Sequence, residues 1–358
     1  MTAFLDIDLN AIIANWRLLA QLNPHGETAA VVKADAYGLG AAPVVQALAA
    51  AGCQSFFAAH LAEAVALRPL LPGRRLLTLN GLVPHEAADF IAHEITPVLS
   101  SLQDVAAWRA AARRLGRELP AFLHLETGLH RLALDARDLA RLAEDPALLE
   151  GVRVETVISH LVNAEQPEDP RNQRQLDEFL RYAAGFAGAR RSLANSPGSF
   201  LGSAFQLDLT RPGAALYGVN TSPWQPCKMH MVVRLRAPIL QIHELPVGAS
   251  VGYGGLWTAQ RLSRIATIGV GYADGLLRSL TNQGVAYFDD QPVPLVGRVS
   301  MDLATFDVTD APSASPGDCL VLLGDQHGVD ELGREAGSIG YEILTSLGRR
   351  YQRRYSGA

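Results

Sequence analysis

The sequence predicts an α/β protein, with an N-terminal (β/α)8 barrel followed by a mostly antiparallel β domain. Three observations support this prediction. Short apolar runs alternate with helical segments between residues 29 and 220, as in a parallel barrel. No GxGxxG motif follows the first run, which disfavours an open dinucleotide-binding sheet. Beyond residue 229, apolar and polar residues alternate between glycine and proline turns, which is typical of antiparallel strands.

Each barrel element is expected from its own pattern of apolar residues. The helical segments carry apolar residues at every third or fourth position. Helices of this kind connect parallel strands by right-handed crossovers, and eight repeats favour a closed barrel. The expected helices are 40–51, 61–71, 101–116 and 171–188. The expected strands are 29–34, 55–60, 75–80, 95–100, 121–126, 154–159, 191–196 and 215–220.

The length of 358 residues is enough for about two domains. We expect the barrel over 1–229 and the β-rich domain over 230–358, with the boundary in the loop SPWQPCKM. The first few residues are candidates for joining the C-terminal domain.

Composition excludes several classes of protein. Apolar residues make up 48% and charged residues 19%, so disorder is excluded as the main state. The net charge of −5 includes no basic block, so no nucleic-acid partner is expected. No run approaches the roughly 18 apolar residues of a membrane span, and no signal peptide is visible, so we expect a cytoplasmic protein. Cys53, Cys227 and Cys319 lack metal-ligand spacing and fit packing roles in a reducing compartment.

Lysine is rare in this chain. Of 31 basic residues, only Lys33 and Lys228 are lysine. Arginine keeps its proton in proteins, whereas lysine can act as a base and form a Schiff base. Lys228 lies in a turn-like segment, and we interpret it as a surface residue. Lys33 ends an apolar run, so its amine is expected at the barrel mouth, where burial beside cations lowers a lysine pKa.

The carboxyl ends of barrel strands are where active sites form. A lone Asn or Thr there is more often a structural group, and His160 alone also fits a buried core histidine. Together, however, the polar residues at these ends indicate one site. Backbone N–H groups near Tyr37, Ser196 and Gly213 suit a phosphate, and with a Schiff-base lysine they suggest pyridoxal phosphate. The residues are Lys33, Tyr37, Asn80, Thr127, Arg131, His160, Asn195, Ser196 and Arg211.

A series of motifs extends this hypothesis over both domains. AVVKADAYGLG resembles the pyridoxal-phosphate lysine signature of the alanine racemases, which are barrel-type (fold type III) enzymes. In the same order as in that family follow ETGLHR, SHLVNAE, ANSPG, TRPGAALYG, VGYGG, GYADG and GRVSMD. The resemblance implies an isomerase that interconverts L-alanine and D-alanine and supplies D-alanine for peptidoglycan.

The resemblance also implies roles for individual residues. Lys33 would hold the cofactor and act as one acid/base group, and Tyr253 from the partner subunit would act as the other. Arg131 would bind the substrate carboxylate, assisted by the backbone N–H of the partner's Met301. The implied assembly is a homodimer with shared active sites, in which each β domain completes the other subunit's site.

The remaining implied residues contact the cofactor, and no metal is implied. Arg211 would face the pyridine nitrogen, and as a permanently charged group it would not transfer its proton there. His160 would bridge Arg211 and Tyr253. The phosphate would be held by Tyr37, Ser196, Gly213 and Ala214.

Two positions depart from the family pattern. His124 stands where many members carry a carbamylated lysine that orients the arginine, so Arg131 must be positioned otherwise, with His124 and Glu126 as candidates. Arg349 stands where the family often has a phosphate-binding tyrosine, and the sequence does not decide whether its guanidinium replaces the phenol.

Three other functions are alternatives to this one. A non-catalytic pyridoxal-phosphate carrier of the same barrel type would lack the second domain. A barrel-type decarboxylase is disfavoured by GYADG and Tyr253. A serine or broad-specificity racemase stays open, as does the choice between a biosynthetic and a catabolic role.

Overall fold

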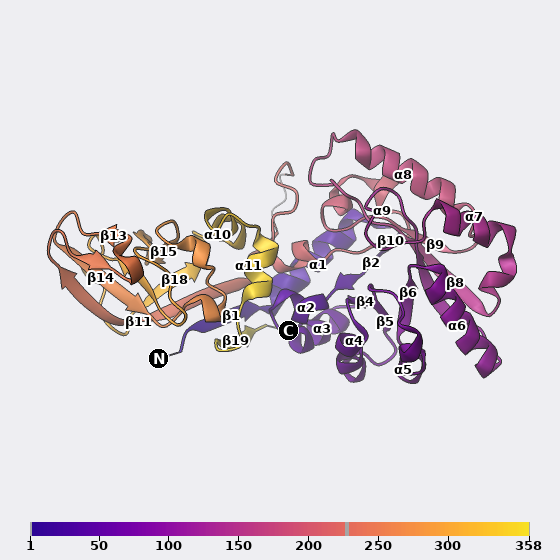
Figure 1. Cartoon of the computed structure of the whole chain (residues 1–358), viewed down its shortest axis with the longest axis horizontal. Helices are drawn as coiled ribbons and strands as arrows, with labels where there is room; N and C mark the ends of the chain where they lie inside the picture. Colours follow the sequence, from indigo (N-terminus) through magenta and orange to yellow (C-terminus); the bar gives the residue numbers. More distant parts are fainter. Residues whose placement is uncertain (1, 226–228, 358) are drawn as a thin grey trace.

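The computed structural model describes residues 2–225 and 229–357. An α/β barrel and a β-rich region lie next to each other along the long axis of the molecule (Figure 1). Cys227, Lys228 and the middle of the expected boundary loop lie outside the described residues. The predicted fold class is confirmed.

The barrel is built on a seven-stranded parallel sheet. Its core is apolar, and the rings of Phe57 and Phe122 meet edge to face inside it with centroids 6.1 Å apart. The strands, in order, are β3 (Ala30–Val31), β4 (Ser55–Ala58), β5 (Arg75–Thr78), β6 (Thr96–Leu99), β7 (Leu119–His124), β8 (Val152–Ile158) and β9 (Arg190–Ser192). All seven fall within or overlap expected runs.

Helices connect these strands, and the four expected helical segments are confirmed. Their apolar faces are buried and their polar faces exposed, as the periodicity predicts. The helices are α3 (Ala41–Ala50), α4 (Leu61–Leu67), α5 (Ala87–Ala92), α6 (Leu102–Leu115), α7 (Ala136–Glu144), α8 (Pro170–Ala183) and α9 (Ser203–Gln206).

The expected eighth strand, 215–220, is wrong. That stretch begins with a buried 3-10 turn, η5 (Ala214–Tyr217). The barrel is completed instead by β10 (Leu209–Thr210), which pairs in parallel with β2 (Glu27–Thr28). The Arg211 N–H, which donates to the Ala194 carbonyl at 2.9 Å, links this strand to the segment after β9. A two-residue strand is too short to show a periodicity in the sequence. Because β10 ends at Thr210, Arg211 follows the last strand, whereas the expected strand 215–220 would have placed it before that strand.

The chain begins in the β-rich region. Strand β1 (Phe4–Asp8) pairs antiparallel with β11 (Val233–Leu245) and parallel with β19 (Gln352–Ser356). The carboxylate of Asp8 then accepts the Ala11 N–H at 3.0 Å and caps α1 (Leu9–Leu22), which leads into the barrel.

The β-rich region is a mostly antiparallel eight-stranded sheet with two short helices. One of them, α11 (Gly340–Ser346), packs against the barrel turn α2 (Lys33–Tyr37), between the two regions in Figure 1. No helix in the described part of the chain is long and apolar enough to cross a membrane. The other elements are β12 (Ser250–Val251), β13 (Trp257–Thr258), β14 (Ser263–Ile268), β15 (Val285–Phe288), β16 (Gln291–Pro294), β17 (Ala304–Asp307), β18 (Cys319–Leu323) and α10 (Val329–Glu335).

Candidate active site

Lys33 opens a left-handed turn at the end of β3. Residues Ala34 to Tyr37 all have φ between 53° and 55°, although none is glycine. This conformation costs about 1–2 kcal/mol per residue, so tertiary contacts must hold it. The Asp35 carboxylate accepts the Ala41 N–H at 2.7 Å and ties the turn to the start of α3.

The amine of Lys33 lies in a partly buried, positively charged setting. Burial lowers its pKa below the usual value, the Arg131 guanidinium lowers the pKa further, and the Glu63 carboxylate opposes both. Glu63 is also engaged elsewhere, because its carboxylate accepts the Ala34 N–H at 2.7 Å. Within the described residues the Lys33 amine has no hydrogen-bond or ion-pair partner. The positive charge of the Lys33 amine is thus disfavoured, which favours the neutral form that reacts with a carbonyl.

Arg211 is a buried cation directly after β10, and its residue is only 5% exposed. It donates to the Ser192 hydroxyl and, at 2.5 Å, to the Ser159 carbonyl. Burial lowers its pKa to about 10, so it stays charged at neutral pH. No carboxylate pairs with it in the part of the chain that the structure describes, and a buried cation without an anion calls for a ligand acceptor.

Two histidines beside Arg211 are held neutral. Burial, followed by the charge of Arg211, lowers the pKa of His160 to about 3 and that of His124 to about 4. The His160 Nε2 lies 3.4 Å from the Asn195 amide nitrogen. The expected hydrogen bond from Arg211 to His160 is absent among the described contacts, because the guanidinium is turned to the two serines.

The expected phosphate ligands come together around the start of η5. The Ser196 hydroxyl accepts the N–H groups of Gly213, at 2.9 Å, and Ala215, at 3.3 Å. A Cβ on Gly213 would lie 2.2 Å from the Tyr37 hydroxyl, so only glycine permits this approach. Burial raises the pKa of Tyr37 to about 12, which keeps its phenol a hydrogen-bond donor.

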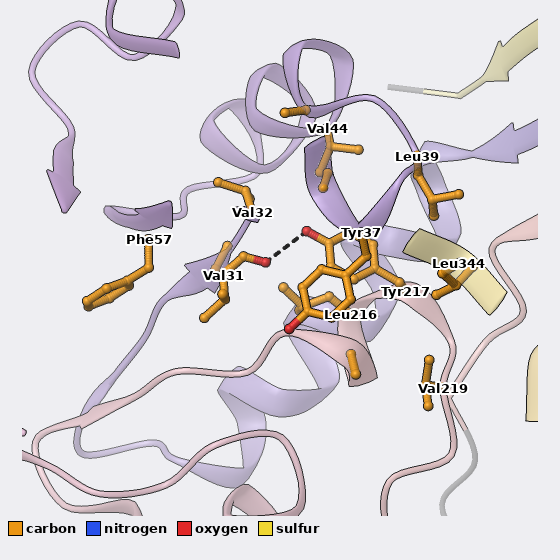
Figure 2. Packing of buried hydrophobic residues seen from close by; sticks show 14 of the residues in the cluster. Val31, Val32, Tyr37, Leu39, Val44, Phe57, Leu216, Tyr217, Val219 and Leu344 are labelled. Atoms are coloured by element: carbon orange, nitrogen blue, oxygen red, sulfur yellow. Dashed lines mark hydrogen bonds between the residues drawn. The ribbon is translucent and has the colours of Figure 1, made fainter. Parts of the chain in front are cut away.

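Aromatic packing holds Tyr37 in this place. Its ring lies against that of Tyr217, with centroids 4.8 Å apart. The Tyr217 hydroxyl donates to the Val31 carbonyl at 2.9 Å, as Figure 2 shows. The strand before Lys33 and the residue at the end of its turn are thus joined through one buried ring.

Arg131 lies close enough to Lys33 to lower its pKa, whereas Tyr253 and Met301 are not gathered at this site within one chain. Tyr253 is 71% exposed in η6 (Tyr253–Gly255), directly before β13 of the β-rich region. Met301 is 54% exposed, and its N–H has no acceptor in the described part of the chain. Arg131 is also exposed and without a partner there, so its guanidinium is available to an anion.

The two residues that depart from the family pattern, His124 and Arg349, and the nearby Glu126 form no hydrogen bond within the described chain that positions Arg131 or marks a phosphate site. Glu126 does not hold Arg131, since its carboxylate accepts the N–H groups of Gly128 and His130. His124 lies near the charges of Arg131 and Arg211, but its side chain forms no hydrogen bond with the described residues. Arg349 is exposed and has no polar partner in the same part of the chain.

Sequence reasoning missed two groups that support the site. Glu63 lies three positions after His60 and forms the capping box at the start of α4 with it. This spacing is visible in the sequence. Gln175, on the buried face of α8, donates to Thr127 at 3.3 Å and to the His160 carbonyl at 3.1 Å. No local signal distinguishes that glutamine from its polar neighbours.

The described residues fit pyridoxal phosphate. An unpartnered lysine amine, a buried guanidinium without an anion and a cradle that a single Cβ would fill lie at the same barrel mouth. Among the described residues, no group of three or more side chains could hold a metal ion. The fold and these residues define a class of protein, the barrel-type enzymes that carry pyridoxal phosphate on a lysine.

Comparisons with known proteins identify the family within this class. A family model of the alanine racemase N-terminal domain matches residues 7–221, and one of the C-terminal domain matches residues 232–355. The chain belongs to the alanine racemase family.

Similar proteins match over nearly their full length. An alanine racemase of Acidiphilium cryptum is 53% identical over 98% of this chain and 97% of that protein. The crystal structure of an alanine racemase from Bartonella henselae with covalently bound pyridoxal phosphate is 40% identical, with a TM-score of 0.96, and the match covers 99% and 100% of the two chains. A biosynthetic alanine racemase from Pseudomonas aeruginosa is 35% identical, with a TM-score of 0.91 and 99% of each chain covered.

Proposed function

We propose that the protein interconverts L-alanine and D-alanine, with pyridoxal phosphate held by Lys33. The observation that carries this proposal is the amine of Lys33, which is partly buried beside the Arg131 guanidinium and has no anionic partner in the described part of the chain. Membership in the alanine racemase family supports the choice of substrate.

The barrel residues that lie around the start of η5 and directly after β10 would bind the cofactor. Tyr37, Ser196, Gly213 and Ala214 would hold its phosphate, and Arg211 would donate to the ring nitrogen. Because Arg211 keeps its proton at neutral pH, it would orient the ring without protonating it. Pyridoxal phosphate, when bound, delocalises the electron pair that deprotonation leaves on the substrate Cα.

Two groups on opposite faces of the substrate would move the proton. Lys33, whose pKa is lowered by burial and by Arg131, would take the Cα proton from one face. The partner subunit's Tyr253 would deliver a proton to the other face, and the reverse reaction exchanges their roles. Arg131, assisted by the partner's Met301 N–H, would hold the substrate carboxylate so that Cα lies between the two groups.

The assembly that this mechanism requires is a homodimer with shared sites. Tyr253 is a large, exposed aromatic side chain, as expected of a residue that is covered by a partner. The proposed role of the protein, in the cytoplasm, is to supply D-alanine for peptidoglycan.

The test follows the loss of optical activity when the purified protein, supplied with pyridoxal phosphate, is mixed with single L-amino acids. We expect L-alanine to be racemised fastest. The Lys33→Ala variant should be inactive and should lack the absorbance band of the lysine-bound cofactor. Preference for L-serine would indicate the alternative specificity. Retention of the band in Lys33→Ala would show that another amine carries the cofactor.

A further inference from the structure

We propose that the C-terminal strand β19 holds the turn that carries Lys33, and that Arg353 and Tyr355 are positioning residues for the reaction. The inference deepens the proposed function and rests on it only in taking Lys33 and Tyr37 as cofactor ligands. It goes beyond that function because neither residue lies at the barrel mouth or in the motifs that define the site.

The turn cannot hold its own conformation. From Ala34 to Tyr37 the backbone is left-handed at non-glycine residues, which is a strained conformation. Such a segment persists only when its surroundings determine it. Its two ends are Lys33 and Tyr37, so any relaxation of the strain would move both proposed cofactor ligands.

Glu63 of the barrel holds the beginning of the turn. One carboxylate oxygen of Glu63 accepts the Ala34 N–H at 2.7 Å, and the other accepts the Ala59 N–H at 2.8 Å. The turn is thereby joined to the end of the neighbouring strand β4. This contact leaves the carbonyl groups that follow Tyr37 to be satisfied from elsewhere.

The β-rich region supplies those contacts. Arg353 donates to the Gly38 carbonyl at 2.6 Å, across 315 positions of sequence, and also reaches the Gly348 carbonyl at 3.4 Å. The Tyr355 hydroxyl donates to the Leu39 carbonyl at 3.0 Å. Both side chains lie two positions apart on β19, so they project from the same face of that strand.

Close packing makes these contacts from Arg353 and Tyr355, together called the clasp, rigid. A Cβ on Gly38 would lie 2.2 Å from the Leu344 carbonyl of α11, and one on Gly40 would lie 2.1 Å from the Tyr355 hydroxyl. The side chain of Leu344 belongs to the same buried cluster as Leu39 and Tyr37, as Figure 2 shows. With backbone atoms in direct contact, a shift of β19 or α11 is transmitted to the turn.

The clasp should therefore act on the cofactor and on turnover more than on substrate binding. Arg131, which would bind the substrate carboxylate, lies in a different loop, to which β19 forms no hydrogen bond among the described residues. Loss of the clasp should lower cofactor affinity and kcat and leave KM for alanine nearly unchanged.

The experiment compares Arg353→Gln, Arg353→Lys and Tyr355→Phe with a matched control, Arg354→Gln. Arg354 neighbours Arg353 on β19, but its guanidinium lies over the Phe4 ring, 3.9 Å from the centroid. The measurements are titration of each apoprotein with pyridoxal phosphate, hydrogen–deuterium exchange of the apoprotein peptide over 34–41, and kcat and KM of the loaded enzyme.

We expect Arg353→Gln to bind pyridoxal phosphate about tenfold more weakly, which corresponds to ~1.4 kcal/mol for a hydrogen bond from a charged donor. Tyr355→Phe should weaken binding roughly threefold to fivefold, as for a neutral hydrogen bond. In both variants the peptide 34–41 should exchange faster. Arg353→Lys should recover part of the loss, and Arg354→Gln should match the wild type.

The outcomes separate this inference from the function on which it rests. If the wild type racemises alanine but Arg353→Gln and Tyr355→Phe match Arg354→Gln in affinity and exchange, the clasp is refuted. If the wild type does not bind pyridoxal phosphate, the proposed function fails, while exchange in the apoproteins still decides whether β19 holds the turn. Should Arg353→Gln misfold, Tyr355→Phe removes a single oxygen atom and decides the question.

Discussion

At the scale of single residues, charge and burial at the barrel mouth determine which groups can exchange protons. Burial lowers the pKa values of Lys33, His124 and His160, and the neighbouring arginines lower them further. Arg211 remains positive because even its lowered pKa is about 10. The mouth therefore combines a fixed positive charge, which suits a phosphate and a carboxylate, with an amine whose pKa is lowered.

Tyr253→Phe separates cofactor binding from proton transfer. We expect the variant to bind pyridoxal phosphate normally but to lose racemisation by about a hundredfold or more, the contribution of a positioned acid/base group. Exchange of solvent deuterium into L-alanine and D-alanine should also become unequal, because only the Lys33 face remains active. Tyr287→Phe, in the same region of the chain, serves as the control. Near-normal turnover by Tyr253→Phe would refute its assignment.

The buried histidines should make the apoprotein less stable in acid. The pKa of His124 is lowered to about 4, from an unfolded value of about 6.5, so between these values only the unfolded chain binds the proton. The free energy of unfolding should consequently fall as pH decreases through this range, with a contribution of at most about 1.4 kcal/mol per pH unit from this residue. Urea unfolding between pH 7.5 and 5 should show a shallower decrease for His124→Gln. An unchanged slope would mean that His124 is protonated in the folded protein.

At the scale of elements, the shortest segments are decided by their neighbours. Strand β10 has two residues and exists because β2 pairs with it. The left-handed turn after β3 opposes the local preference of four non-glycine residues and depends on Glu63, Arg353 and Tyr355. Elements of this kind are less stable alone than long amphipathic helices such as α8, so their positions depend on the rest of the molecule.

A pair of glycine substitutions tests the contact between the turn and α11. Gly38 and Gly73 both have positive φ, 82° and 70°, so alanine is strained at either position. Among residues 2–225 and 229–357, nothing lies within 4 Å of a Cβ on Gly73, whereas a Cβ on Gly38 would meet the Leu344 carbonyl. In urea unfolding we expect Gly73→Ala to cost about 1 kcal/mol and Gly38→Ala about 3 kcal/mol or more. Equal losses would show that α11 can move away without cost.

At the scale of the whole molecule, one chain holds the two proposed acid/base groups in different regions. Lys33 lies in the barrel turn α2, and Tyr253 lies directly before β13 in the β-rich region. A two-fold dimer in which each β-rich region covers the partner's barrel would bring them together twice.

Mixing two inactive variants tests this assembly. In a heterodimer of Lys33→Ala and Tyr253→Phe, one site carries both defects and the other carries neither. With random exchange about half of the dimers are mixed, so up to roughly a quarter of all sites should regain activity. The measurement is alanine racemisation after subunit exchange, which is monitored with tagged chains. If the subunits exchange and no activity returns, both groups act within one chain.

The sequence by itself determined the fold class, because long amphipathic helices and apolar strands such as 121–126 carry their periodicity locally. It also singled out Lys33, since a lone lysine at a strand end in an arginine-rich chain is visible without any contact. Its motif resemblance led to the alanine racemase family, which the comparisons confirmed. Only the tertiary structure decided that β10 completes the barrel, that the turn after Lys33 is left-handed, and that Arg353 and Tyr355 reach it from the C-terminal strand. The physical reason is that these features depend on contacts between residues up to 316 positions apart, which no local pattern encodes.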